Sequence, residues 1–457
     1  MAGMVVPTDP DHDPGYFGCP FFRGPMDQTA RLDITNWLVS SGLSGLPETD
    51  LVRGFCERCR EAGLELSRGL VFIDTLDPIF EGRGFRWSDG NVEESDTFEY
   101  GSTSEGEAAR NWRRSMFYAM LEQGHSELRI DLCNLAAYDF SQIEDIAAKG
   151  HKDLVAFVHR LETRNFIGEM DCVYSYWTLR HQHGFHDQAR GALRDLVPVL
   201  GLAVKARSLT RVARTLGQVY LGRDAAERVL SGRISRGVAD RIKAVLWFSD
   251  LRTYTAISAA MEPAEIIPFL NDYADAAISA IHDAGGDVLK LIGDGVLAIF
   301  NTADLAVAKH AALRAENQFR KNIQEINRRR ASESRPFTTA YVGLHVGEVF
   351  YGNIGSEDRL DFTVVGPAVN EVSRIASMCN SVDRELLISS AFLIGLDAEG
   401  RNHFVSTGRF ALRGIGQAQD LFTLDPEIRS GDVLADRYDL YLQAQTSAVD
   451  NSGIDVG

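Results

Sequence analysis

Hydrophobic positions follow two different periods along this chain, and the period changes from segment to segment. Apolar residues spaced three or four apart predict amphipathic helices, over Gln28–Ser41, Glu48–Ala62, Pro263–Asp283 and Asp304–Arg328. Short alternating or continuous apolar runs predict strands, over Ser67–Asp74, Cys172–Leu179, Lys243–Asp250, Phe337–Val346, Phe404–Leu412 and Asp420–Leu424. Paired runs predict hairpins at Val288–Phe300 and Gly347–Val365. The sequence therefore predicts a mixed α and β protein.

The same pattern predicts five segments. A tail rich in Pro, Gly and Asp (1–28) precedes a mixed regulatory domain (29–201), and a helical linker (202–242) leads to a second α/β domain (243–425). A polar C-terminal tail (426–457) follows, and we expect both tails to be flexible.

Leucines seven residues apart mark the helix before the second domain. Leu202, Leu209 and Leu216, with Val212 and Val219 between them, form a short seam of the coiled-coil type. The seam has two interpretations: a single amphipathic helix packed on its own domain, or a parallel helix pair that joins the domains of a dimer.

Composition limits the classes of function. A chain of 457 residues predicts two or three domains. The net charge of -17 argues against a non-specific nucleic-acid or anionic-membrane surface. The chain has no apolar run of the roughly 20 residues that a membrane span needs, and its N-terminus lacks a signal pattern. Six cysteines in so long a chain predict reduced thiols and a cytoplasmic location.

Four polar residues in the second domain predict phosphoryl-type chemistry. Asp250 ends an apolar run and Asp294 lies at the tip of a predicted hairpin, while Asn370 and Arg374 are four apart and share one helix face. Paired carboxylates can hold hard divalent cations, and an Asn and an Arg can orient and neutralise a phosphoryl group. Taken singly, each has an ordinary alternative as a cap, a turn residue or a surface ion pair, so the prediction depends on the combination.

Four ordered segments carry a family resemblance. They are Phe-Ser-Asp-Leu-Arg-Thr-Tyr-Thr (248–255), Lys-Leu-Ile-Gly-Asp-Gly-Val-Leu-Ala-Ile-Phe (290–300), Gly-Leu-His-Val-Gly-Glu-Val-Phe-Tyr-Gly-Asn-Ile-Gly (343–355) and Phe-Thr-Val-Val-Gly-Pro-Ala-Val-Asn-Glu-Val-Ser-Arg (362–374). Residues 243–424 thereby resemble the catalytic domain of class III nucleotidyl cyclases. The resemblance implies a ferredoxin-like α+β fold and a homodimer that converts a nucleoside triphosphate to its 3′,5′-cyclic monophosphate at the subunit interface.

The resemblance also implies roles for single residues. Asp250 and Asp294 match the metal-binding aspartates, with Leu251 beside them, for two Mg²⁺ or Mn²⁺ ions per site. The backbone from Leu251 to Thr255 enters a helix N-terminus whose free amides suit phosphate oxygens. Asn370 matches the residue that orients the ribose, and Arg374 the residue that stabilises charge at the α-phosphate.

Further positions concern the terminal phosphates and the base. Arg413 matches a cationic phosphate clamp that is often Lys, and Arg359 is a candidate second phosphate contact or a surface residue. Lys290 matches the adenine-contacting lysine, and Thr363 its partner position. A Lys and Thr pair resembles subgroup IIIb, some members of which respond to bicarbonate. The predicted substrate is therefore ATP, with guanylate cyclase and a catalytically silent cyclase fold as alternatives. The chain lacks the turn motif typical of diguanylate cyclases.

The predicted homodimer divides each site between two chains. One subunit provides Asp250, Asp294 and Arg359, and the other provides the remaining residues, Lys290, Thr363, Asn370, Arg374 and Arg413.

The N-terminal half is similar to a GAF-like sensor domain. Tyr-Ser-Tyr-Trp-Thr-Leu-Arg (174–180), followed by Gly-Phe-His-Asp and a long helix, carries the similarity. It implies an unidentified small-molecule effector. Two local clusters, Cys56 with Cys59 and His181 with His183 and His186, are interpreted as ordinary thiols and a solvated loop rather than metal sites.

Overall fold

The computed structural model describes residues 26–90, 96–161, 170–430, 438–440 and 442–443. The chain forms two compact units, Met1–Thr215 and Leu216–Gly457. Their boundary falls inside one helix, α6 (Asp187–Leu221).

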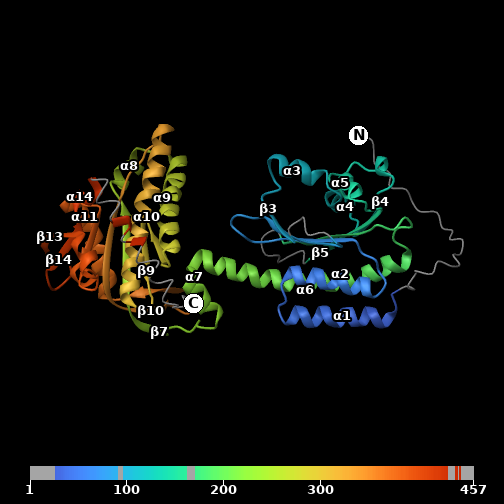
Figure 1. The fold of residues 1–457 in the computed structure, drawn as a ribbon, viewed down its shortest axis with the longest axis horizontal. Helices are drawn as coiled ribbons and strands as arrows, with labels where there is room; N and C mark the ends of the chain where they lie inside the picture. Colours follow the sequence, from blue (N-terminus) through green and yellow to red (C-terminus); the bar gives the residue numbers. More distant parts are fainter. Residues whose placement is uncertain (1–25, 91–95, 162–169, 431–437, 441, 444–457) are drawn as a thin grey trace. The chain divides into compact units, whose positions relative to one another are not determined.

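The first unit is built on an antiparallel six-stranded sheet with the order β3-β2-β1-β6-β5-β4. Its strands are β1 (Arg68–Asp74), β2 (Gly82–Ser88), β3 (Thr97–Tyr100), β4 (Glu127–Asp131), β5 (Asp153–Arg160) and β6 (Cys172–Leu179). Figure 1 shows helices on both faces of this sheet. On one face lie α1 (Gln28–Leu43), α2 (Glu48–Glu61) and the first part of α6, and on the other α3 (Gly106–Arg113), α4 (Met116–Gln123) and α5 (Ile143–Ala148).

Alternation along the strands explains why both faces need a helical layer. Successive side chains of a strand point to opposite faces. Every residue of β6 is buried, on both faces of the sheet. On one face Trp177 packs against Phe55 of α2, with ring centroids 4.9 Å apart. Tyr174 and Tyr176 join the apolar cluster on the other face.

The second unit contains an eight-stranded sheet with the order β13-β14-β12-β10-β7-β9-β8, and β11 pairs with β10. The strands are β7 (Ala239–Leu251), β8 (Asp287–Ile292), β9 (Gly295–Phe300), β10 (Ala340–Gly355), β11 (Leu360–Val365), β12 (Leu386–Ser389), β13 (Phe404–Phe410) and β14 (Gln419–Leu424). The helices are α7 (Arg223–Leu230), α8 (Tyr254–Ala260), α9 (Pro263–Asp283), α10 (Leu305–Ser332), α11 (Pro367–Val382), α12 (Ser390–Leu393), α13 (Ala398–Asn402) and α14 (Pro426–Ser430).

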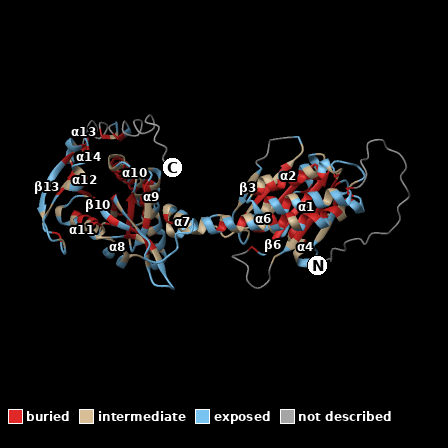
Figure 2. Ribbon diagram, turned by 90° about the horizontal axis from the view of Figure 1, so that it is seen from below, coloured by how far each residue is buried: buried red, intermediate tan, exposed pale blue. Residues whose placement is uncertain are grey.

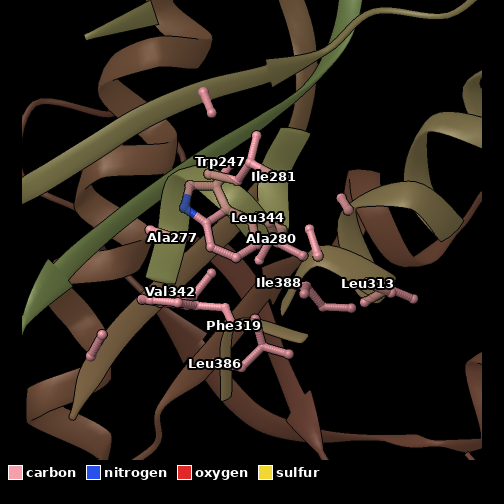
Figure 3. Close-up of a cluster of buried hydrophobic side chains, with 14 of the residues drawn as sticks. Trp247, Ala277, Ala280, Ile281, Leu313, Phe319, Val342, Leu344, Leu386 and Ile388 are labelled. Carbon is pink, nitrogen blue, oxygen red and sulfur yellow. The ribbon is translucent and has the colours of Figure 1, made fainter. Parts of the chain in front are cut away.

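Strand β7 lies in the middle of this sheet and supplies both cores. Val245 and Trp247 pack with α9 and α10 on one face. Leu246, the residue between them, packs with α7 and α11 on the other. Trp247 is fully buried among Ala277, Ile281, Phe319, Val342, Leu344 and their neighbours (Figure 3). Figure 2 shows the buried residues concentrated between the sheets and their helices.

The predicted mixed α and β class is confirmed, and several element boundaries agree with the sequence pattern. Helix α9 has the predicted limits, as does strand β6. Among the described residues, no helix is long and apolar enough to cross a bilayer.

Other boundaries differ from the predictions. Helix α10 continues to Ser332, past its predicted end at Arg328, because its last turn is held by contacts of Arg329 and Arg330 with Asp272. Strand β7 begins at Ala239, inside the predicted linker. The predicted N-terminal tail lies almost wholly outside the described residues. The expected C-terminal tail includes α14, and Tyr438 and Leu442 are buried in the core of the second unit.

The residues of the leucine seam differ in how far the structure buries them. Val212 is buried, with 3% of its surface exposed, whereas Leu202 and Val219 are 67% and 54% exposed. A single chain therefore buries only part of the seam.

Candidate active site

Strand register brings Asp250 and Asp294 together. Strand β7 pairs with β9, and Ser249 lies opposite Val296. Ile292 pairs with Gly295, so Gly293 and Asp294 form the turn between β8 and β9. Gly293 takes a φ of 64°, a conformation in which a side chain would be strained. The tip of the hairpin thus lies beside the end of β7, and the Leu251 N–H donates to Asp294 Oδ2 over 3.2 Å.

The two carboxylates repel each other. Asp250 reaches solvent, but neighbouring protein atoms displace much of the water around its carboxylate. This desolvation, with a hydrogen bond to Asp294 and repulsion by its charge, raises the pKa of Asp250 to about 7. Like charges held this close favour either a shared proton or a cation. The pair has the oxygen donors and the charge that Mg²⁺ or Mn²⁺ prefers, so the residues fit a divalent cation.

Asp250 and Asp294 supply only part of the ligand shell of a metal ion. Within the described ranges, no group of three or more His, Cys, Asp or Glu residues is placed to hold a metal ion. Mg²⁺ commonly binds through one or two carboxylates together with water and substrate phosphates. A small cavity of about 180 Å³ adjoins the pair, lined on one side by α9 residues including Leu270 and Asn271.

The backbone after Asp250 is less free than the sequence suggested. The N–H groups of Leu251 and Arg252 are bonded to Asp294 and to the Thr339 carbonyl. Helix α8 starts only at Tyr254, after Thr253 in a left-handed conformation with φ 55°. Two of the five amides expected to receive phosphate oxygens, those of Leu251 and Arg252, are therefore already used, and Thr255 lies exposed in the first turn of α8.

Helix α11 presents Asn370 and Arg374 to solvent. Both are exposed, while Val372, Ile375 and Ala376 are buried against the sheet. The predicted common face is thus present. Among the described residues, however, no hydrogen bond or ion pair joins this face to Asp250 or Asp294 in one chain.

Lys290 has a partner that sequence reasoning missed. Its ammonium group binds Asp361 Oδ2, and the two side chains are 49% and 47% exposed. Asp361 precedes Thr363 by two residues on β11, so both side chains lie on the same face of the hairpin. This period-two spacing of Asp361 and Thr363 was the signal available in the sequence.

The two candidate phosphate contacts are exposed in turns. Arg359 closes the β10–β11 turn, where the Ser356 N–H donates to its carbonyl over 2.9 Å. Arg413 lies in the turn between β13 and β14. No described contact brings either guanidinium to Asp250 or Asp294.

Comparison with known families gives the second unit its class. The profile of the adenylate and guanylate cyclase catalytic domain matches residues 239–425. Residues 239–425 are a domain of this family. The match contains every site residue considered above, from Asp250 to Arg413.

Several known proteins are similar to the part of the chain that contains this cyclase domain. An adenylate cyclase of Anabaena cylindrica is 32% identical over 48% of this chain and 45% of its own length. Adenylate cyclase 1 of Rhizobium meliloti is 26% identical over 44% of this chain and 30% of its own length. The chain thus spans less than half of these relatives. The solved adenylyl cyclase CyaB of P. aeruginosa is 23% identical over 41% of this chain and 96% of that chain, with a TM-score of 0.37.

A buried histidine stabilises the cyclase domain beneath α11. His345 Nδ1 lies 2.8 Å from Ser389 Oγ, and its Nε2 lies 3.3 Å from Glu371 Oε2. Ser389 Oγ accepts the Phe392 N–H over 3.2 Å, so its own hydrogen can go to Nδ1, which leaves Nε2–H to donate to Glu371. Glu371 adjoins Asn370, so this chain of contacts fixes the start of α11.

The structure places the two local clusters of the first unit in different surroundings. Cys56 and Cys59 are both fully buried, and burial raises the pKa of each thiol well above its usual range, which disfavours the reactive thiolate. His181, His183 and His186 are exposed.

Burial of His345 predicts a pH-dependent stability. Burial lowers its pKa to about 4, against about 6.5 in an unfolded chain. The unfolded state therefore binds an extra proton between these values, and the free energy of unfolding falls as the pH drops from 6.5 to 4. We expect His345→Asn to remove up to about 3 kcal/mol of this dependence, measured by urea unfolding of the full chain across that range.

An exposed histidine provides the control. His125→Asn should leave the wild-type dependence unchanged. An equal pH dependence in wild type and His345→Asn would contradict the assignment.

Proposed function

We propose that the protein is an adenylate cyclase that converts ATP to 3′,5′-cyclic AMP and pyrophosphate. The observation that carries the proposal is the carboxylate pair Asp250–Asp294 at the end of β7, within a domain of the cyclase family. The similar proteins of Anabaena cylindrica and Rhizobium meliloti are named adenylate cyclases, which supports ATP as the substrate.

The residues suit an in-line attack of the ribose 3′-oxygen on the α-phosphorus. The bond between the α-phosphorus and the bridging oxygen breaks, pyrophosphate leaves, and the 3′-hydroxyl proton passes to solvent. Bound Mg²⁺ or Mn²⁺ supplies the positive charge that acidifies the hydroxyl and neutralises the triphosphate. Asp250 and Asp294 would hold the two ions, with the Leu251 backbone beside them. Asn370 would orient the ribose, and Arg374 would stabilise charge on the α-phosphoryl oxygens.

Base and phosphate contacts follow from the same arrangement. The Lys290 ammonium can donate to the adenine N1 acceptor, where guanine has a donor, and Thr363 lies on the neighbouring strand. Arg413 and Arg359 would contact the terminal phosphates with their guanidinium groups. Asp361 holds the ammonium group of Lys290, which lies within β8, and acts as its positioning residue.

Each site needs two copies of the chain. One chain leaves Asn370 and Arg374 without a described contact to Asp250 or Asp294, which a symmetric dimer would resolve. One subunit would provide Asp250, Asp294 and Arg359, and its partner the base, ribose and transition-state contacts.

The first unit would regulate the cyclase through the linker. We propose a GAF-like sensor whose signal reaches the cyclase domain through α6 and α7. Asp287, the first residue of β8, accepts the N–H groups of Arg223 and Asp224 at 3.0 and 3.3 Å and so caps α7. A displacement of α7 would therefore act on the strand that carries Lys290. Bicarbonate remains a further candidate effector.

The proposal is tested by measuring cyclic-nucleotide formation by the purified full chain. We expect cyclic AMP from ATP with Mg²⁺ or Mn²⁺, and little cyclic GMP from GTP. Asp294→Ala should lower the rate at least about 100-fold, because it removes half of the carboxylate pair.

The matched control removes a carboxylate elsewhere. Asp275, exposed on α9, can be changed to Ala with the rate kept within about twofold. Cyclic GMP as the main product would reassign the substrate to GTP. No cyclic product from either nucleotide would identify a catalytically silent cyclase domain.

The Lys290–Asp361 contact predicts a change in substrate preference. Asp361→Asn should lower kcat/KM for ATP roughly tenfold, because an unheld lysine loses a charge-assisted contact with the base. The pair is half exposed, so thermal stability should change little. The measurement compares kcat/KM for ATP and GTP with the melting temperature.

Asp358 offers a control on the same hairpin. It is exposed in the β10–β11 turn, and Asp358→Asn should leave both kinetic values unchanged. An Asp361→Asn enzyme with wild-type preference would show that the contact does not position Lys290 for catalysis.

A further inference from the structure

Helix α1 of the first unit carries apolar residues on two opposite faces. Ile34 and Leu38 form its buried face. Leu32, Val39 and Leu43, spaced seven and four residues apart, lie on the other face and are 56%, 49% and 85% exposed. A surface helix has one apolar stripe, whereas a helix that is apolar all round is covered on both sides. Within the described residues of one chain, the outer face of α1 therefore lacks the cover that this pattern predicts.

Helix α6 carries a second exposed apolar stripe. Leu202, Ala206 and Ala213 are exposed, and Leu209 is half-buried. Their spacing of four, three and four residues keeps them on one side of the helix. It has the average period of about 3.5 residues that is typical of a helix packed along another helix. Ala206 and Ala213, and not the buried Val212, thus lie between the leucines on the exposed side of the seam.

The two stripes adjoin each other. Arg31 of α1 pairs with Asp195 of α6 at 2.8 Å, and a Cβ atom on Gly42 would lie 3.1 Å from the Cβ of Ala203. The residue numbers rise together along both helices, so α1 and α6 run in the same direction. The exposed leucines next to Gly42 and Ala203 in the sequence lie beside this contact. We call the two stripes together the α1–α6 surface.

The segments that form the α1–α6 surface are poor in charge. Residues 34–47 contain no Asp, Glu, Lys or Arg, and residues 196–204 contain none either, although 24% of the whole chain is charged. Depletion of charged residues is the compositional mark of the core of a protein interface. A lipid surface is a poorer occupant, because helices that lie on membranes carry Lys and Arg beside their apolar face and the net charge of this chain is -17.

From this arrangement we infer that the α1–α6 surface binds a second copy of the chain, so that two first units pack in parallel about a twofold axis. The period of the α6 stripe requires a helix as its neighbour. Alanines at alternate positions of the stripe let two helices approach closely. A twofold axis brings each stripe to its own copy, which makes the contact self-complementary.

The choice of a second copy as the partner rests on the proposed cyclase homodimer. Helix α6 is one continuous helix, Asp187–Leu221, that crosses the boundary between the two units. A chain that pairs through its cyclase domain therefore already has the second α6 available. The inference goes further, because it assigns a self-association surface to the first unit, outside the residues of the cyclase site.

The first test places a single reactive cysteine on the surface of the full chain. Exposed Cys133, and Cys19, which lies outside the described residues, are first changed to Ser, and the other four cysteines are buried. In this background Ala206→Cys should form mostly covalent dimer with a short bismaleimide, read on a denaturing gel. Ala108→Cys, exposed on α3 at the opposite face of the sheet, should remain monomeric on the gel.

The second test introduces a charge into the same surface. Leu202→Glu should raise the dissociation constant of the full-chain dimer at least about tenfold, because the contact would then bury two carboxylates. Sedimentation velocity over a dilution series measures this constant. Ile79→Glu is the matched control, since Ile79 is 75% exposed in the loop between β1 and β2, and the wild-type constant should be kept.

Three results would overturn the inference. One is equal crosslinking of Ala206→Cys and Ala108→Cys, and another is a wild-type dissociation constant for Leu202→Glu with unchanged circular dichroism. The third is crosslinking of Ala206→Cys only after residues 1–25 are deleted, which would identify that segment as the cover of the surface. Each result leaves the proposed cyclase activity to its own assay. Selective crosslinking in a protein that forms no cyclic nucleotide would support the surface and reject only the enzyme.

Discussion

Repulsion between Asp250 and Asp294 is the constraint on which the second unit depends. The two carboxylates are adjacent because β7 and β9 pair in a fixed register and Gly293 allows a tight turn. Desolvation, together with this closeness, raises the pKa of Asp250, and the pair costs stability in the absence of a counter-charge. The buried core around Trp247 compensates for this cost and keeps the two strand ends in place. The electrostatic strain is therefore located where a divalent cation would relieve it.

The strands around this pair distribute the other functional groups. Strand β8 carries Lys290 and leads into the turn with Asp294, while β11 carries Asp361 and Thr363. Helix α11 presents Asn370 and Arg374 and is fixed beneath by His345 and Glu371. One chain thus holds two incomplete groups of site residues, on rigid elements, and a second copy of the chain completes each of them in the proposed dimer.

Periodicity predicted the elements whose patterns are strong. Helix α9 has an uninterrupted apolar stripe between a proline start and a double-glycine end, and its limits agree with the structure. Strand β12 was missed because four residues are too few to show a period, and the start of helix α8 was expected only from the family resemblance. Helix α10 exceeds its prediction because Asp272, far away in the sequence, neutralises the arginines of its last turn. Such tertiary contacts override local propensity.

At the candidate site, too, the sequence did not reveal contacts between residues that are far apart in the chain. Asp250, Asp294, Asn370 and Arg374 were recognised because they sit in continuous motifs. Asp361 was missed, because its importance lies in an ion pair to a residue 71 positions away.

Mixing two inactive variants tests the shared-site account most directly. Asp294→Ala and Arg374→Ala should each be nearly inactive alone. In an equimolar mixture whose subunits exchange, half of the dimers pair one variant with the other, and each of these contains one intact site. The account predicts recovery of about a quarter of the wild-type cyclic AMP rate. A mixture no more active than either variant alone would contradict the proposal that Asp294 of one subunit acts with Arg374 of its partner.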